Sequence, residues 1–156
     1  MVEELLVFNI AEQRFALPLS SVERVIRAQE ITPVNNSPAF IDGVIDYYGE
    51  VIAAIGLRSR FSFPLQEIQL NDRIIIANTS KRKLALIVDL VEDVFTPKKE
   101  DISNTKTIYS GLQFIETVRD ETGIVLIYDL ENILTNEEDI AIQKLIDAHS
   151  TVKESV

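Results

Sequence analysis

Along most of the chain, hydrophobic positions either alternate with polar ones or form short runs rich in Val and Ile, and turn-forming residues separate these runs. Short apolar segments with such boundaries are typical of β-strands. Because strands follow one another with no helices between them, the pattern predicts a mainly β protein, a barrel or sandwich, rather than a βαβ sheet. The expected strands cover residues 5–10, 14–19, 22–27, 40–47, 50–57, 72–78, 83–95, 111–118 and 123–128, with single helical turns at 20–21, 58–61 and 130–134.

One substantial helix is expected near the C-terminus, over residues 136–149. Asn136 offers N-cap chemistry, and three acidic residues follow it, which suits the positive end of a helix dipole. Ile142, Leu145 and Ile146 recur at helical spacing, so they share one face that we expect to pack on the strands.

The first part of the chain is nearly repeated in the second. Residues 5–26 align without a gap to residues 74–95, and residues 51–57 match residues 124–130 more weakly, at offsets of 69 and 73. Chance remains an alternative, because strands everywhere use the same apolar residues. A duplication predicts two similar β-barrels side by side. The identical pairs are Asn9 with Asn78, Ala16 with Ala85, Leu17 with Leu86, Val22 with Val91, Glu23 with Glu92 and Val25 with Val94.

The linker at residues 62–70 holds Pro64 and has no clean periodicity, so we place the boundary between the two halves there. The prediction is one domain over residues 1–135 made of two intertwined subdomains. The first covers roughly 14–70 and the second roughly 71–135, with the N-terminal strand shared between them as an option. Residues 136–156 form the C-terminal helix and tail.

Composition narrows the function classes. The net charge of −10 argues against a nucleic-acid partner or an anionic membrane, because both need a basic surface. No apolar run approaches the roughly 20 residues of a membrane span. There are no cysteines, which excludes disulfides and thiolate metal sites, and Glu3 and Glu4 stand where a secretory signal would be basic. We therefore expect a cytoplasmic protein without direct membrane insertion.

The sequence offers no organised catalytic group. His149 is the only histidine, and the five glycines are scattered among expected hairpins, so no phosphate-binding loop is present. No loop has calcium-ligand spacing. Asp89 lies among apolar residues and Asp129 precedes a predicted helical turn, where it suits a capping role. We expect no catalytic residue, no metal and no cofactor.

Two tyrosines occupy the tip of the first expected hairpin. Exposed aromatic side chains anchor protein interfaces, so Tyr47 and Tyr48 suggest a binding surface. The alternative is that one ring faces the core and the other lies along the turn. The sequence leaves both interpretations open.

Several segments together resemble the CheW-like chemotaxis coupling proteins, in order from about residue 5 to residue 134. The most specific are Pro38-Ala39-Phe40-Ile41-Asp42-Gly43-Val44 and the Val88-Asp89 step before Val91. The other segments are Val22–Ile26, Gly49–Ile52, Leu57–Phe61, Tyr109–Leu112 and Ile124–Glu131.

The resemblance implies two small SH3-like five-stranded β-barrels and a non-enzymatic adaptor. Proteins of this family couple chemoreceptors to a histidine kinase whose regulatory domain has the same fold. It thus implies two partners, the kinase regulatory domain and the cytoplasmic tip of a chemoreceptor. The alternative is a small-ligand-binding or sensory double-barrel module outside chemotaxis.

The chain departs from the family pattern at several positions. The family typically has Asn-Leu-Arg-Gly at the first hairpin tip, where this chain has Asp46-Tyr47-Tyr48-Gly49. It favours a glutamate where Arg24 stands, an aspartate where Gly56 stands, and a proline where Ala53 or Ala54 stands. Because charge reversals re-specify an interface without changing a fold, we expect altered partner specificity.

The predicted partner surface combines apolar residues, which would fill a groove of the partner, with Arg24 and Tyr48, which would select it. Its residues are Val22, Arg24, Gly43, Tyr48, Gly49, Ile87, Val88, Asp89 and Leu90.

Overall fold

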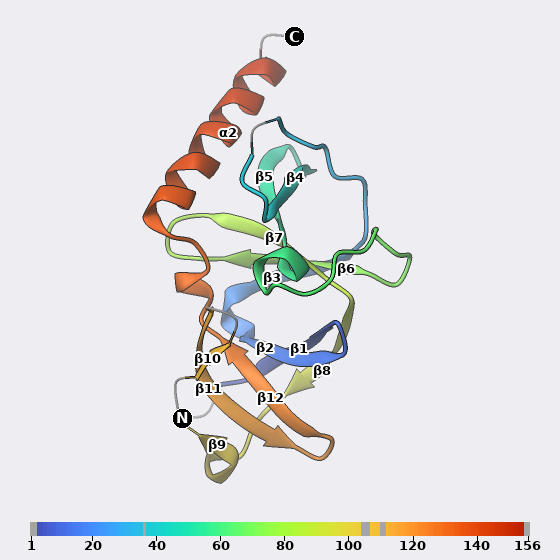
Figure 1. Cartoon of the computed structure of the whole chain (residues 1–156), viewed down its shortest axis with the longest axis vertical. Helices are drawn as coiled ribbons and strands as arrows, with labels where there is room; N and C mark the ends of the chain where they lie inside the picture. Colours follow the sequence, from blue (N-terminus) through green and yellow to red (C-terminus); the bar gives the residue numbers. More distant parts are fainter. Residues whose placement is uncertain (1–2, 36, 104–106, 110–111, 155–156) are drawn as a thin grey trace.

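The computed structural model describes residues 3–154 except 36, 104–106 and 110–111, and for 103, 107–109, 112–115 and 149–154 it describes the backbone alone. Twelve strands of this part form two sheets, one above the other in Figure 1, and one long helix runs along the side of the upper one. The mainly β fold with a C-terminal helix is confirmed.

The upper sheet has five strands in the order β3-β6-β7-β5-β4. These are β3 (Val22–Arg27), β4 (Ile41–Tyr47), β5 (Glu50–Gly56), β6 (Arg73–Asn78) and β7 (Lys83–Val88). The lower sheet runs β10-β11-β12-β2-β1-β8, with β9 paired to β11. Its strands are β1 (Leu5–Ile10), β2 (Gln13–Pro18), β8 (Leu90–Phe95), β9 (Ile102–Ser103), β10 (Thr107–Tyr109), β11 (Leu112–Asp120) and β12 (Gly123–Tyr128). The short strands β9 and β10 are additions to the five that were expected.

The two copies of the repeat exchange strands. The last strand of the first aligned segment, β3, pairs with the first strand of the second segment, β6. Conversely, β8 of the second segment pairs with β1 of the first. Each sheet therefore contains a hairpin from one copy and the following strands from the other.

The pairing registers are identical in the two sheets once the repeat offset is applied. Both exchanged pairs skip one residue of the outer strand, Glu23 in β3 and Glu92 in β8, which makes the same β-bulge twice. The parallel pairs agree as well, with Phe15 opposite Leu126 and Leu84 opposite Ala53. Chance similarity of strand composition does not explain a shared bulge and register, so the duplication is the better explanation.

The boundary expected near residue 70 is not where the sheets divide the chain. Strands β6 and β7 belong to the same sheet as β3, β4 and β5, and β2 belongs to the other sheet. The segment expected as one bent strand over 83–95 is two strands in different sheets, β7 and β8, which separate at Asp89. The reason is that hydrogen bonding between the copies satisfies strand edges that each copy alone would leave open.

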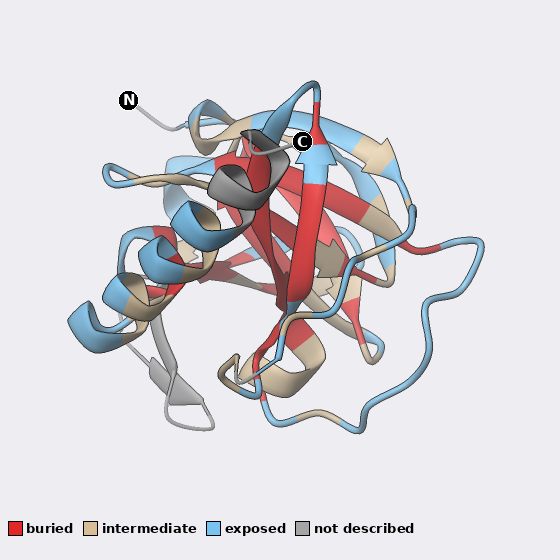
Figure 2. Cartoon of the chain, turned by 90° about the horizontal axis from the view of Figure 1, so that it is seen from above, coloured by how far each residue is buried: buried red, intermediate tan, exposed pale blue. Residues whose placement is uncertain are grey.

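One hydrophobic core spans both sheets. Phe15 of β2 lies 4.9 Å, between ring centroids, from Phe61, and Phe61 lies 5.1 Å from Tyr128 of β12. The same cluster contains Ile55 and Leu86 of the upper sheet. Figure 2 shows the buried residues concentrated on the strands in the middle of the molecule, with exposed loops around them. Aromatic rings thus join the two sheets, and each sheet also has a separate buried cluster of its own, around Ile74 in the upper sheet and around Val125 in the lower one.

The predicted short helical turns are present as η1 (Leu19–Ser21), α1 (Leu57–Arg60) and η3 (Leu130–Asn132), and η2 (Lys99–Asp101) lies in a segment expected as loop. The long helix α2 (Asn136–Glu154) extends beyond residue 149. Its predicted cap is wrong. Thr135 and Glu138 form a reciprocal capping box, since the Glu138 amide donates to Thr135 Oγ1 (3.1 Å) and the Thr135 amide to Glu138 Oε1 (2.8 Å).

Helix α2 is attached to the upper sheet by packing and by charge. Ile142 on its inner face is fully buried. Arg82 Nε donates to Asp139 Oδ1 (2.6 Å), and Arg60 Nη1 donates to Glu138 Oε2 (2.8 Å). Arg82, in the turn between β6 and β7, thus supplies one of the two ion pairs that hold the helix among the described residues.

Candidate functional site

The tip of the β4–β5 hairpin is a two-residue turn with both residues at positive φ, Tyr48 at 51° and Gly49 at 87°. Two-residue hairpin turns of this kind match the twist of the strands they connect. Asp46 Oδ1 accepts a hydrogen bond from the Gly49 amide at 2.8 Å, which closes the turn. The left-handed conformation at Tyr48 is uncommon for a bulky residue, so the turn holds this side chain in an outward direction.

The two tyrosines have different environments. Tyr47 is 8% exposed and packs in the upper sheet, whereas Tyr48 is 80% exposed. Their ring centroids are 4.8 Å apart in an edge-to-face arrangement. Both interpretations left open by the sequence therefore hold, one for each tyrosine.

Arg24 of β3 holds the ring of Tyr48 from the side. Its Nη1 donates to Tyr48 Oη at 2.6 Å, and its guanidinium carbon lies 5.3 Å from the ring centroid. Within the part of the chain that the structure describes, Arg24 has no ion pair. An exposed aromatic ring and an uncompensated positive charge are thus pre-arranged side by side, which lowers the entropic cost of using them in an interface.

A network of charged residues around Lys83 stabilises the arrangement of Arg24 and Tyr48. Lys83 of β7 pairs with Glu23 (3.0 Å) and with Glu50 (3.5 Å), and its ammonium lies 5.5 Å from the Tyr47 ring centroid. The hydrogen bond from Lys83, with smaller contributions from Asn78 and Tyr47, lowers the pKa of Glu23. Desolvation, followed by the hydrogen bond to Glu23, raises the pKa of Tyr47. The network therefore holds the Tyr47 ring, which is in edge-to-face contact with the Tyr48 ring.

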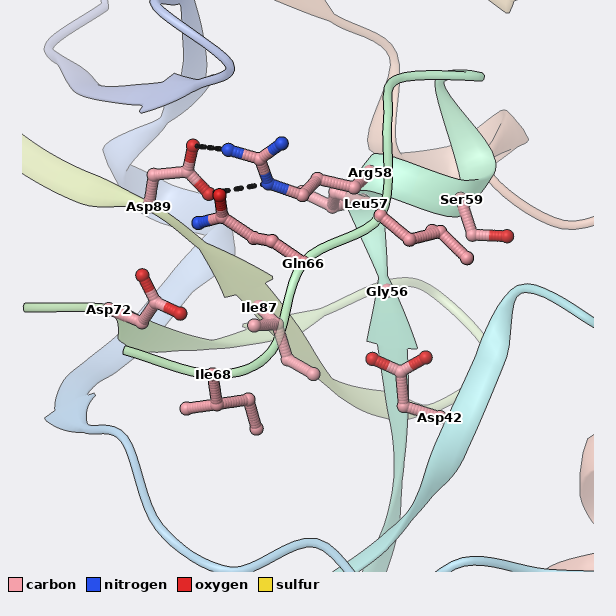
Figure 3. Close-up of a pocket in the computed structure, with 11 residues that line it drawn as sticks. Asp42, Gly56, Leu57, Arg58, Ser59, Gln66, Ile68, Asp72, Ile87 and Asp89 are labelled. Atoms are coloured by element: carbon pink, nitrogen blue, oxygen red, sulfur yellow. Dashed lines mark hydrogen bonds and ion pairs between the residues drawn. The ribbon is translucent and has the colours of Figure 1, made fainter. Parts of the chain in front are cut away.

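A second group of predicted residues lies where the chain passes from the upper to the lower sheet (Figure 3). Asp89 accepts a forked pair of hydrogen bonds from Arg58 of α1, whose Nε to Oδ1 distance is 3.1 Å. Asp89 Oδ2 also accepts from the Ala11 amide (2.8 Å), and the Asp89 amide donates to the Asn9 carbonyl (3.0 Å). One carboxylate thus connects the β1–β2 turn with α1. Because Arg58 Nη1 also donates to the Pro64 carbonyl (2.8 Å), it fixes the following loop as well.

We call the contact of Asp89 with Arg58 and the β1–β2 turn the joint between the sheets. Beside it is a pocket of about 150 Å³, lined by Asp42, Gly56, Ile68, Asp72 and Ile87 among others. A Cβ atom on Gly56 would lie 2.7 Å from Asp42 Oδ1, so the Asp42 carboxylate occupies the space that a side chain at position 56 would need. Burial raises the pKa of Asp42. Small-molecule pockets usually measure about 300–1,000 Å³, so this pocket does not support the ligand-binding alternative.

The family model for the CheW-like domain matches residues 4–138.

This chain belongs to the CheW-like family.

Its relatives include the chemotaxis protein CheW of Treponema pallidum, 24% identical over 91% of this chain and 86% of that protein. The CheW of Thermotoga maritima is 28% identical over 90% of this chain and 91% of its own length. A probable chemotaxis protein CheW of Rhizobium etli is 32% identical over 70% of this chain and 71% of that protein. The crystal structure of the scaffolding protein TtCheW from Thermoanaerobacter tengcongensis superposes with a TM-score of 0.79 at 26% identity, covering 88% of this chain and 96% of that one.

The CheW-like fold places six of the nine predicted partner residues in two separate places. Arg24, Tyr48 and Gly49 are exposed and lie together at the hairpin tip, whereas Val22 is half-buried and packs against the core shared by the two sheets. Ile87, Asp89 and Leu90 lie at the joint between the sheets, where Leu90 is 45% exposed. No hydrogen bond or ion pair among the described residues connects the two places.

Two of the nine residues are buried and cannot contact a partner in this conformation. Val88 is 1% exposed and belongs to the shared core. Gly43 is buried with φ of 149°, and a Cβ there would lie 2.1 Å from the Thr32 carbonyl oxygen. Glycine at this position allows the backbone of residue 32 to pair with Val44.

Several residues that shape the two places were missed from the sequence. Arg58, Glu23 and Lys83 form the contacts that hold Asp89 and the tyrosines. A signal existed for Arg58 and Glu23, and also for Asp42, because all three lie in segments that carry the family resemblance. Lys83 gave no signal, because its role depends on cross-strand neighbours.

Other site types find no support in the described part of the molecule. No group of three or more acidic or histidine side chains there is arranged to hold a metal ion. None of the described helices combines the length and the apolar character that a membrane span requires.

Proposed function

We propose that this CheW-like protein is a non-enzymatic cytoplasmic adaptor that couples chemoreceptors to a histidine kinase in chemotaxis-type signalling, with a partner preference of its own. The family match over residues 4–138 and relatives described as chemotaxis and scaffolding proteins support the coupling role. The proposed partners are the regulatory domain of the kinase and the cytoplasmic tip of a chemoreceptor.

The contact between Arg24 and Tyr48 carries the proposal of an altered preference. These residues stand where the family usually has a glutamate and an arginine, and here they form one exposed unit. A partner that presents an arginine to the family glutamate would meet a guanidinium instead, and like charges across an interface are costly. A partner with a carboxylate or carbonyl at that point would gain a charge-assisted hydrogen bond.

The joint between the sheets is the second proposed contact. Ile87 and exposed Leu90 flank Asp89, which Arg58 and the Ala11 amide hold in place. A partner seated there would touch both sheets at once. In this proposal the joint provides affinity through apolar contact, while the hairpin tip provides selection.

The proposal is tested by capture from a lysate of the native host, followed by titration of purified protein with the regulatory domain of the captured kinase and with a receptor tip. Saturable binding to both supports the coupling role. Failure to bind either purified partner at concentrations that saturate a CheW relative overturns it. An altered preference predicts that the relative and this protein rank the same two kinase domains in opposite order.

A further inference from the structure

The loop between α1 and β6 presents an exposed apolar surface. Leu65, Ile68 and Leu70 have exposed fractions of 75%, 44% and 97%, the last being nearly that of a free side chain. Scattered apolar residues on a surface are ordinary, but three within a stretch of six residues concentrate them. Ile68 and Leu70 border a hollow, and Ile68 also lines the pocket of Figure 3.

The turn that carries Leu70 is held rigidly. Asp72, the only charged side chain that is buried among the described residues, accepts a hydrogen bond at Oδ2 from the Gln69 amide (2.8 Å). The Asp72 amide donates to the Gln69 carbonyl (3.0 Å), which completes the turn. Arg73 Nη1 donates to the carbonyls of Asp72 (2.9 Å) and Leu70 (3.3 Å). A leucine that is fixed while fully exposed loses little freedom on binding, as an interface anchor requires.

The same hollow is basic, although the protein as a whole carries a net charge of −10. Arg27 ends β3 and Arg73 begins β6, and the two lie directly opposite each other in the antiparallel register. Like charges in this arrangement repel each other, so a neighbouring anion would stabilise them. Neither has an ion pair within the described residues, although Glu30 also borders the hollow. By contrast, Arg14, Arg58, Arg60 and Arg82 are all paired with carboxylates.

We propose that this hollow, bordered by Arg27, Ala28, Glu30, Ile68, Leu70 and Arg73, docks an acidic segment of another protein that carries apolar side chains. Carboxylates of the partner pair with Arg27 and with the free face of the Arg73 guanidinium, and an apolar side chain covers Leu70 and Ile68. A protein segment fits better than a nucleic acid, because two arginines in an acidic molecule cannot neutralise a phosphate backbone. The hollow adjoins the hairpin tip, since Arg27 and Ala28 also border a second hollow that Tyr48 lines. The inference does not depend on the coupling role.

The test uses the full chain and a fluorescent amphipathic peptide of glutamate and leucine. Fluorescence anisotropy should show saturable binding that weakens with added salt. Leu70→Ser and Arg27→Glu should each weaken it by about tenfold or more, as for interface anchors. Ile124→Ser and Arg119→Glu, exposed residues of the lower sheet, are the matched controls and should change it less than about twofold.

Binding of any one of three further probes would contradict the proposal. A lysine and leucine peptide, a DNA duplex, or vesicles of phosphatidylserine and phosphatidylcholine that bind as well as the acidic peptide would each overturn it. Self-association lost in Leu70→Ser would assign the surface to a second copy of this chain instead. Equal binding of the acidic peptide by Leu70→Ser and Ile124→Ser would also overturn it. Normal binding of the kinase domain by Leu70→Ser separates this surface from the proposed coupling site.

Discussion

Arg24 Nη1 donates a hydrogen bond to Tyr48 Oη at 2.6 Å, across the 24 residues that separate β3 from the hairpin tip. The two positions at which the chain departs most from its family in charge are thus in contact. A change at either one alters the other, so they act as one surface in partner choice. Of the residues that support them, Tyr47 is buried in the sheet and Lys83 is half-buried.

Arg24→Glu is expected to weaken binding of the native partner by about tenfold or more, because it reverses a charge at the proposed contact. The melting temperature should change little, since the side chain is exposed and has no ion pair among the described residues. Titration calorimetry and thermal unfolding measure the two effects. Arg119→Glu makes the same charge change on the lower sheet and should leave both unchanged. An unaltered affinity in Arg24→Glu would remove this residue from the partner surface.

Tyr48→Arg is expected to shift preference toward kinase domains that bind typical CheW proteins, because it restores the usual residue at the hairpin tip. Competition between two kinase domains for the immobilised variant gives the measurement. Tyr48→Phe serves as the control, since it keeps the ring and removes only the hydroxyl that Arg24 binds. If Tyr48→Arg and Tyr48→Phe show the same ranking of kinases, the tip does not select.

Asp89→Asn is expected to lower the free energy of unfolding by about 2 kcal/mol, because it weakens the forked pair with half-buried Arg58 and the bond from the Ala11 amide. Chemical denaturation measures the loss. Asp93→Asn, on the exposed side of β8, is the control and should stay within about 0.5 kcal/mol of the parent. Equal stability of the two variants would mean that Asp89 does not hold the joint.

The environment of Asp120 should make the free energy of unfolding depend on pH. Hydrogen bonds from Arg14, reinforced by Thr122, hold the pKa of this carboxyl well below its ordinary value of 3.8. A lowered folded-state pKa gives stability that is complete above the unfolded value and is lost as the pH falls toward the folded one. Asp120→Asn should therefore cost about 1–2 kcal/mol at neutral pH, and its deficit should shrink below about pH 4. Urea unfolding across this range measures it, with Glu121→Gln as the exposed neighbour. A deficit that stays constant with pH would contradict the assignment.

Gly56→Asp, which restores the usual family residue, is expected to destabilise this protein by about 1–2 kcal/mol, because two carboxylates would then share one space. In the Asp42→Ala background the same substitution should be nearly neutral. A double-mutant cycle measures the coupling between the two positions. Gly56→Ala separates steric from charge effects, since it requires only that Asp42 turn aside. Additive effects in the cycle would show that the two sites are independent.

Local patterning predicted most of the strands and three of the helical turns, because side-chain alternation and turn residues depend on nearest neighbours alone. It also identified the two copies of the repeat and the conspicuous position of Asp89. It did not predict that the strand expected over residues 83–95 divides at Asp89, because apolar residues continue on both sides of this position. The capping residue of α2 was misplaced by one position, since Thr135 and Asn136 offer similar chemistry and only the Glu138 contact distinguishes them.

The order of residues is enough to establish a mainly β chain, its internal repeat and its membership of a family with that architecture. The exchange of strands between the copies becomes evident only from the folded chain, since periodicity defines the face of a strand but not its hydrogen-bonding partner. The tertiary structure also decided that Tyr47 is buried while Tyr48 is exposed beside Arg24, and that Asp42 fills the space at Gly56. In each case the outcome depends on atoms that are distant in sequence, and pairing across strands brings them together.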